Sequence, residues 1–130
     1  MTPEFNAVGL IADDMHKTLA FYRLLGFDIP EEAEQQPHVE VTTASGVRLM
    51  WDSADMVRSM DPSWTPPSAG HRAALAFDCA TPSEVDTTYT RLTEAGHKGH
   101  HPPWDAPWGQ RYATVLDPDG TPVDLYAPLA

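Results

Sequence analysis

Apolar and polar residues alternate strictly in two short stretches on either side of Asp117-Pro118-Asp119-Gly120. Proline presets φ at the second residue of a turn and glycine tolerates the positive φ that follows, so the pattern predicts a β-hairpin. One face of this hairpin is apolar and should pack on a helix. The opposite face carries Gln110, Tyr112, Thr114, Pro122, Asp124 and Tyr126. That polar face is either solvated or the wall of a binding cleft, with Trp108 at its rim if the first strand starts early.

The first half of the chain predicts one helix followed and preceded by strands. Asp13 or Asp14 caps a helix that runs to about Leu25, before Gly26, which is suited to a helix end. Its buried stripe at helical spacing consists of Met15, Leu19, Tyr22 and Leu25. Strands are expected over residues 6–11, 27–30, 37–43 and 47–52. The order is therefore βαβββ.

Alternation also assigns faces to the strands over residues 37–43 and 47–52. Trp51 falls on the apolar face with Val39, Val41, Val47 and Leu49, and is expected in the core. The other face carries His38, Glu40, Thr42, Arg48, Met50 and Asp52.

The second half repeats the first at an offset of roughly seventy residues, which indicates a duplicated module. After a proline-rich connection over residues 53–71, with one helical turn at 56–60, a strand is expected over 73–79. A capping box at 81–84 then begins a helix that Gly96 closes, and a proline-rich loop leads to the hairpin. We expect an α+β fold, a single domain of two βαβββ modules (1–52 and 72–130). Their curved mixed sheets enclose a cleft, with the helices outside.

Composition narrows the class of partner. The net charge of −11 argues against nucleic acid, and permits a neutral or cationic small ligand. No apolar run is long enough to span a membrane and no secretory signal is visible. The single cysteine, Cys79, cannot form an internal disulfide and is expected to be buried rather than nucleophilic. These features favour a cytoplasmic protein.

Sequence motifs for catalysis are absent, whereas aromatic residues are prominent. There is no nucleophile elbow, phosphate loop or CxxC pair. Glu40 and Asp124 could form a carboxylate pair for acid–base work, but no partner residue favours this over a polar cleft wall. His97, His100 and His101 could bind metal, although a solvated loop is the simpler reading. Trp64 and Trp104 either rim a pocket or cover the core.

Several stretches carry a resemblance to a known family. AVGLIADDMHKTLAFYRLLGF, LAFDC, WGQRYATVLDPDG and VDLYAP together resemble the vicinal oxygen chelate superfamily, which includes glyoxalase I, extradiol dioxygenases and bleomycin-binding resistance proteins. Within it, FYRLLGFDIP, PHVE, GVRLMWD, RSMDPSW, PWGQRYA and VDLYAPL are most similar to mitomycin-binding resistance proteins of antibiotic producers. The resemblance covers essentially the whole chain.

The resemblance places metal ligands on the first and last strand of each module in metal-bearing members. Those positions fall here on Ala7, Met50, Ala74 and Asp124. Only Asp124 could bind a divalent metal, which needs several ligands. We therefore expect no metal and no cofactor.

The resemblance implies a self-resistance protein that sequesters an aromatic or quinone natural product without turnover, the drug being mitomycin-, bleomycin- or enediyne-like. Trp108 and His38 would stack on the drug. Hydrogen bonds and contacts would come from Gln110, Tyr112, Thr114, Glu40, Met50, Asp52 and Asp124. Relatives form homodimers whose clefts lie between the N-terminal half of one chain and the C-terminal half of the other. The alternatives are a lyase or isomerase acting on a small carbonyl compound, or a carrier that delivers the drug to an exporter.

Overall fold

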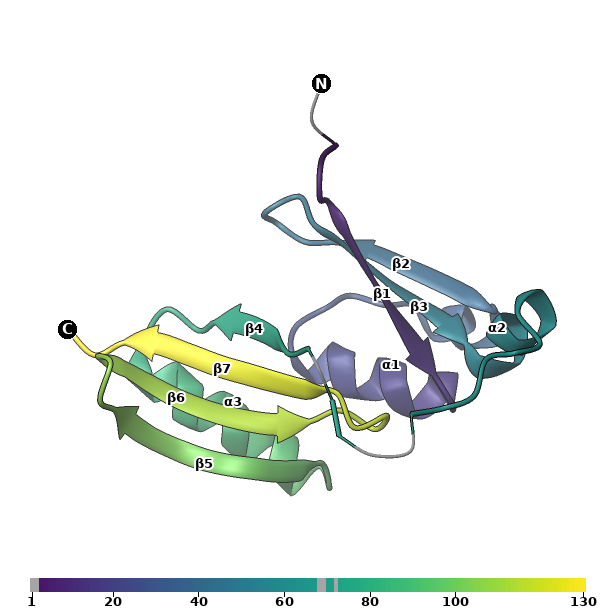
Figure 1. The fold of residues 1–130 in the computed structure, drawn as a ribbon. Coiled ribbons are helices and arrows are strands. Elements are labelled where there is room, and N and C mark those ends of the chain that lie inside the picture. Colours follow the sequence, from purple (N-terminus) through teal and green to yellow (C-terminus); the bar gives the residue numbers. More distant parts are fainter. Residues whose placement is uncertain (1–2, 68–69, 72) are drawn as a thin grey trace. The chain divides into compact units, whose positions relative to one another are not determined.

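The computed structural model describes residues 3–67, 70–71 and 73–130, and it divides into two compact units, Met1–Pro66 and Pro67–Ala130 (Figure 1). Unit 1 contains β1 (Ala7–Ala12), α1 (Met15–Leu24), the 3₁₀ helix η1 (Glu31–Gln35), β2 (His38–Thr42), β3 (Arg48–Ser53) and α2 (Ala54–Met60). Unit 2 contains β4 (Leu75–Asp78), α3 (Pro82–Glu94), β5 (Lys98–Ala106), β6 (Gln110–Leu116) and β7 (Pro122–Pro128). The α+β class is confirmed. No helix in the described ranges is long and apolar enough to cross a membrane.

The sheet of unit 1 has the strand order β1-β3-β2, with β1 parallel and β2 antiparallel to β3. Helix α1 begins after Asp14, whose side chain accepts a hydrogen bond from the Lys17 backbone N–H. The helix packs on the sheet through Tyr22, whose ring centroid lies 5.0 Å from that of Trp51. The predicted core position of Trp51 is thereby confirmed. Of the predicted helix stripe, Met15, Leu19 and Tyr22 are buried and Leu25 is half-buried; Phe21, which the stripe omitted, is also fully buried.

The strand predicted over residues 27–30 is wrong, and the described part of unit 1 has three strands instead of four. Arg23 explains the difference, because its guanidinium donates hydrogen bonds to the carbonyl oxygens of Ile29 and Pro30. The same guanidinium forms an ion pair with Glu34 on η1. Backbone carbonyls held by a side chain are not available to a sheet ladder, so this segment follows α1 as a loop and one 3₁₀ helix.

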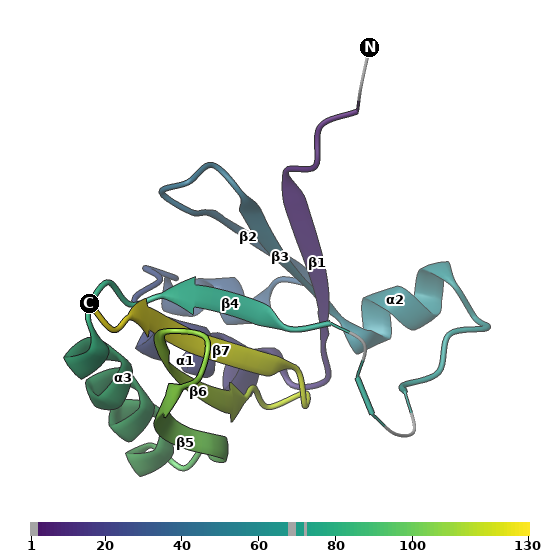
Figure 2. The same cartoon turned by 60° about the vertical axis from the view of Figure 1, so that its left-hand side comes forward.

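The sheet of unit 2 has the order β4-β7-β6-β5, and α3 contacts β5, β6 and β7 on one face (Figures 1 and 2). Helix α3 begins after Thr81, whose hydroxyl accepts from the Glu84 backbone N–H, one of the two hydrogen bonds of the predicted capping box. The predicted hairpin is confirmed as β6 and β7. Its inward residues Ala113, Val115, Val123 and Leu125 are fully buried. Gly120 has φ 87° in the turn, as expected for glycine there.

The proline-rich stretch before the hairpin is a strand as far as Ala106, so the loop expected over residues 102–107 is wrong except at Pro107, which lies in the following turn. Strand β5 pairs with β6, but its register shifts between Gly99 and His101 and again between His101 and Trp104. His101 pairs with Thr114 and Trp104 with Tyr112, so three residues of β5 match two of β6. The extra residue at Pro102-Pro103 forms a bulge, which re-aims the following side chain. His101 and Trp104 therefore lie on the same face, although odd spacing would separate them on a regular strand.

Candidate ligand-binding site

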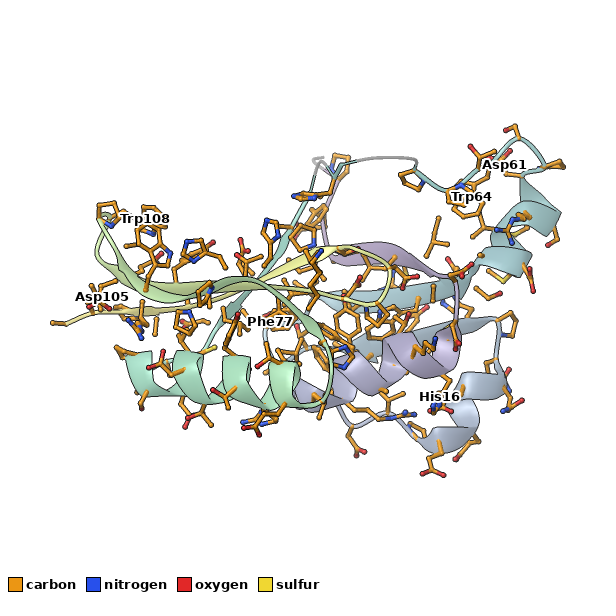
Figure 3. All side chains as sticks on the ribbon, turned by 90° about the horizontal axis from the view of Figure 1, so that it is seen from below. His16, Asp61, Trp64, Phe77, Asp105 and Trp108 are labelled. Atoms are coloured by element: carbon orange, nitrogen blue, oxygen red, sulfur yellow. The ribbon has the colours of Figure 1, made fainter. Side chains whose placement is uncertain are left out.

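The sheet face of unit 2 opposite α3 carries a row of five rings, called here the aromatic ladder: His101, Trp104, Trp108, Tyr112 and Tyr126. Successive ring centroids are 5.1, 5.6, 5.5 and 6.3 Å apart. Figure 3 shows Trp108 on one side of this sheet and Phe77 on the other side, toward α3. The hairpin's polar face is therefore an aromatic surface with hydroxyl, amide and carboxylate groups among the rings.

Trp108 lies in the turn between β5 and β6, because β6 begins at Gln110 and not earlier. Gly109, with φ 93°, allows the tight turn that folds the indole back over the sheet. The indole Nε1–H donates to the Gln110 side-chain oxygen at 2.9 Å. The ring meets Trp104 at 89° and Tyr112 at 78°, so neither neighbour stacks parallel on it. With 58% of the residue exposed, the indole is held in place and still open to a flat ligand.

A polar cluster adjoins Trp108 on the same face. The Asp124 carboxylate accepts hydrogen bonds from the Tyr112 and Thr114 hydroxyls, each at 2.8 Å. Register explains the convergence, because Thr114 and Tyr112 pair with Asp124 and Tyr126 across β6 and β7. Burial, followed by the hydrogen bond to Asp124, raises the pKa of Tyr112 to about 12. The phenol therefore keeps its hydrogen throughout the physiological range.

The polar face of the unit 1 sheet carries a second cluster, centred on His38. Its Nε2 lies 2.8 Å from Glu40 Oε2 and its Nδ1 lies 2.5 Å from Asp52 Oδ1. Glu40 also accepts from Arg48 at 3.1 Å. Carboxylates only accept, so an imidazole bonded to two of them carries both N–H hydrogens. Accordingly the hydrogen bonds to Glu40 and then Asp52 raise the pKa of His38, and the bond from His38 lowers the pKa of Glu40.

The raised pKa of His38 predicts a pH-dependent contribution to stability. A group whose pKa is raised on folding stabilises the folded state when it is protonated. For His38 this stabilisation is complete below its ordinary pKa of 6.5, and it is lost as the pH rises through the raised pKa of the folded state. Because the side chain is 39% exposed, we expect less than about 1 kcal/mol. Urea unfolding can be measured below pH 6.5 and again above the raised pKa of His38. The wild-type protein should be more stable than His38→Gln only at the lower pH. An equal difference at both pH values would contradict a charged His38.

The residues at the family's metal positions do not fit a divalent metal. Ala7 and Ala74 supply no ligand atom, and Met50 supplies only a thioether. A Cβ at Gly9 would meet the Met50 methyl carbon at 3.8 Å, so this side chain lies over the neighbouring strand. Both oxygens of Asp124 already accept from hydroxyls. Among the described residues, no group of three or more His, Cys, Asp or Glu side chains could hold a metal ion.

The structure gathers the predicted site residues into two groups, one in each unit. Trp108, Gln110, Tyr112, Thr114 and Asp124 meet on the unit 2 face, and His38, Glu40 and Asp52 meet with Arg48 on the unit 1 face. Each carboxylate of the suggested Glu40–Asp124 pair has its partners within its own unit.

Sequence reasoning missed part of the aromatic ladder. The sequence leaves Trp104 between pocket rim and core, and it lies on β5 as a ring partner of Trp108. The sequence favours a solvated histidine loop for His101, but it is a strand residue beside Trp104. Alternation predicts the correct face for Tyr126 without marking it as a site residue. Its cross-strand pairing with Tyr112 is the signal that could have identified it.

Two other candidates are resolved by their surroundings. Trp64 lies near the end of α2, and the Arg58 guanidinium sits 5.3 Å from the centre of its ring (Figure 3). The Trp64 ring therefore makes a cation–π contact with Arg58 of the adjacent helix α2. Burial raises the pKa of Cys79, so the reactive thiolate is disfavoured, in agreement with a half-buried apolar role.

Comparison with known proteins agrees with this fold. Residues 4–125 match the Glyoxalase/Bleomycin resistance protein/Dioxygenase superfamily. No curated protein matches the chain. A glyoxalase/bleomycin resistance protein/dioxygenase family enzyme from Burkholderia phytofirmans PsJN has TM-score 0.83 at 20% identity, with 98% of this chain and all of that one covered.

Two further solved structures are similar. A glyoxalase/bleomycin resistance protein/dioxygenase from Nocardioides has TM-score 0.75 at 25% identity over 99% of this chain and 85% of that one. TioX from Micromonospora sp. ML1 has TM-score 0.62 at 23% identity, over 98% of this chain and 100% of that one. With nearly the whole sequence matched and the fold shared, the chain belongs to the Glyoxalase/Bleomycin resistance protein/Dioxygenase superfamily.

Proposed function

We propose that the protein binds and sequesters an aromatic or quinone natural product, and so protects its producer, without chemical turnover. The observation that carries this proposal is the Trp108 indole, exposed on a polar sheet face and held there by Gln110, Trp104 and Tyr112. A large apolar ring left open to solvent has no role in the core. Its neighbours fix its plane, which gives it a role in stacking on a flat ligand.

The Trp108 side chain is ordered by its neighbours before any ligand binds, and this order supports a binding role more strongly than exposure alone. A side chain that is ordered before binding loses little conformational freedom when the ligand arrives. Aromatic pairs contribute about 0.5–1.5 kcal/mol beyond their buried area, so each correctly oriented ring adds affinity. Gln110 thus acts mainly on Trp108, because its side-chain oxygen is used by the indole.

His38 is the second stacking residue of this proposal. Its two hydrogen bonds are made by the ring nitrogens, so they do not occupy the faces of the imidazole, and the side chain is 39% exposed. Glu40 and Asp52 then orient His38 rather than the drug. The stretches that resemble mitomycin-binding resistance proteins support a mitomycin-like ligand. The same resemblance supports a homodimer.

A second candidate function is acid–base catalysis by a lyase or isomerase on a small carbonyl compound. The specific observation in its favour is His38, which carries a proton between two carboxylates. A protonated imidazole whose pKa lies above its ordinary value can act as a general acid at neutral pH. Both carboxylates beside His38 are already hydrogen-bonded to it, whereas Trp108 is exposed, so the sequestration proposal comes first.

One experiment separates the two functions. A thermal-shift screen of DNA-damaging natural products, beginning with mitomycin C, should reveal a stabilising ligand, because a ligand that binds only the folded state raises its stability. Chromatography of that complex with light scattering should give about twice the chain mass. The ligand released by denaturation should be chemically unchanged.

One result would contradict sequestration, and another would contradict only the homodimer. Recovery of a converted product, formed over several turnovers, would establish the enzyme. A complex with the mass of one chain and full ligand occupancy would refute the homodimer while leaving sequestration in place.

A further inference from the structure

The direction of the hydrogen bonds around Asp124 defines the chemistry of the unit 2 face. A carboxylate has no hydrogen to donate, so the Tyr112 and Thr114 hydroxyls must each direct their single hydrogen to it. Toward any other molecule, these two oxygens then offer only lone pairs. The Asp124 oxygens likewise offer only lone pairs. The three residues together form an acceptor-only cluster with one negative charge.

The acceptor-only cluster lies where a stacked ligand would place its substituents. Tyr112 belongs both to the cluster and to the aromatic ladder, with its ring 5.5 Å from that of Trp108. All three cluster residues are half-buried, so they are shielded but still reachable. Partial burial strengthens the discrimination between ligand groups that donate a hydrogen bond and ligand oxygens that only accept one. An accepting oxygen that faces these lone pairs would lose its bound water without gaining a hydrogen bond.

We propose that the cluster of Tyr112, Thr114 and Asp124 selects planar aromatic ligands that carry an amino or ammonium group on or next to the stacked ring. Its counterpart is a hydrogen-bond donor, and a quinone or ether oxygen is disfavoured at this position. This inference rests on the proposed function, since it assumes a ligand stacked on Trp108. It narrows the ligand class from flat aromatic compounds to flat aromatic amines.

The raised pKa of Tyr112 agrees with this arrangement. A phenol with a pKa of about 12 retains its hydrogen and its bond to Asp124 at any pH at which the protein works. The cluster therefore has the same acceptor-only character across the physiological range. The net charge of −11 acts in the same sense by favouring cationic ligands.

Two matched probes test the inference directly, namely 2-amino-1,4-naphthoquinone and 2-methoxy-1,4-naphthoquinone. They share the stacking ring and differ in whether the substituent donates or only accepts a hydrogen bond. Calorimetric titration of the wild-type protein should show the amino compound binding about tenfold more tightly, the size of one hydrogen bond to a charged group. Equal affinities within about twofold would overturn the inference while leaving stacking, and the proposed function, intact.

Asp124→Asn should abolish or reverse this preference. The asparagine amide donates to one of the two hydroxyls, whose hydrogen must then turn toward the ligand. Tyr112→Phe is the matched control, because it keeps the ring of the ladder and leaves an Asp124 oxygen free to accept from the amine directly. The amino preference should persist in this variant. Thermal midpoints close to wild type would establish that both variants are folded.

The remaining outcomes are also decisive. A preference retained in Asp124→Asn would show that the Asp124 carboxylate does not set the discrimination. A preference lost in Tyr112→Phe alone would show that the freed Asp124 oxygen does not accept from the amine. Either result overturns the inference. If neither naphthoquinone binds wild type nor quenches its indole fluorescence, the stacking surface is absent in solution, and the proposed function fails together with the inference.

Discussion

Replacing Trp108 with alanine is expected to weaken binding of a planar aromatic ligand by roughly 2–4 kcal/mol, or about 30- to 1000-fold in the dissociation constant. Trp108 is 58% exposed, against 36% for Trp104 beside it, and it is not among the buried residues of the core. Its loss removes one hydrogen bond to Gln110 and two edge contacts on the surface. The variant should therefore fold with a thermal midpoint near that of wild type.

Trp64→Ala is the matched control for this experiment. Trp64 is a tryptophan on an irregular segment as well, but it contacts Arg58 in unit 1 and has no place in the aromatic ladder. Its removal should leave ligand affinity unchanged. A Trp108→Ala protein that binds within about twofold of wild type would refute stacking at this ring, and an unfolded variant would make Trp108 a core residue.

The largest effect on stability is expected for Trp51→Ala, at about 3–5 kcal/mol in the free energy of unfolding. Trp51 has no exposed surface, and its ring lies 5.0 Å from that of Tyr22 and 6.5 Å from that of Phe27, measured between centroids. Alanine would leave a cavity between β3 and α1 that the surrounding backbone can fill only in part. Urea denaturation followed by circular dichroism measures the change.

Trp51→Phe gives the comparison that assigns this cost to lost packing. The buried Nε1–H of Trp51 has no hydrogen-bond partner within the described structure, so phenylalanine removes an unsatisfied donor along with part of the ring. We expect it to cost clearly less than alanine. A Trp51→Ala protein as stable as wild type would show that the core of unit 1 is elsewhere.

Alternation predicted the hairpin and its faces because both of its strands are regular. From Gln110 to Leu116 and from Pro122 to Pro128, each residue of β6 pairs with one residue of β7 without a shift. The polar positions predicted to share one face of the hairpin therefore do share it in the structure. The convergence of Tyr112 and Thr114 on Asp124 follows from this register. The buried position of Trp51 was predicted for the same reason.

Prediction failed where a local interaction changed the rule. The bulge at Pro102-Pro103 breaks the period of two, so neither β5 nor the shared face of His101 and Trp104 could be inferred from spacing. Arg23 diverts the backbone after α1 by bonding the Ile29 and Pro30 carbonyls, an interaction that has no sequence pattern of its own. Trp108 lies on the predicted polar face because of the turn between β5 and β6, and not because of alternation along a strand.

The two prolines of β5 also bear on the solubility of the protein. Strand β5 is an edge of its sheet, and an unpaired strand edge is a template onto which another chain can add in β-aggregation. Proline has no backbone N–H to offer an incoming strand, and the bulges on either side of His101 make this edge irregular. The irregularity that places Trp104 and His101 on the ladder face should thus also discourage the growth of fibrils from β5. A single departure from regular pairing would then serve both the proposed ligand recognition and resistance to aggregation.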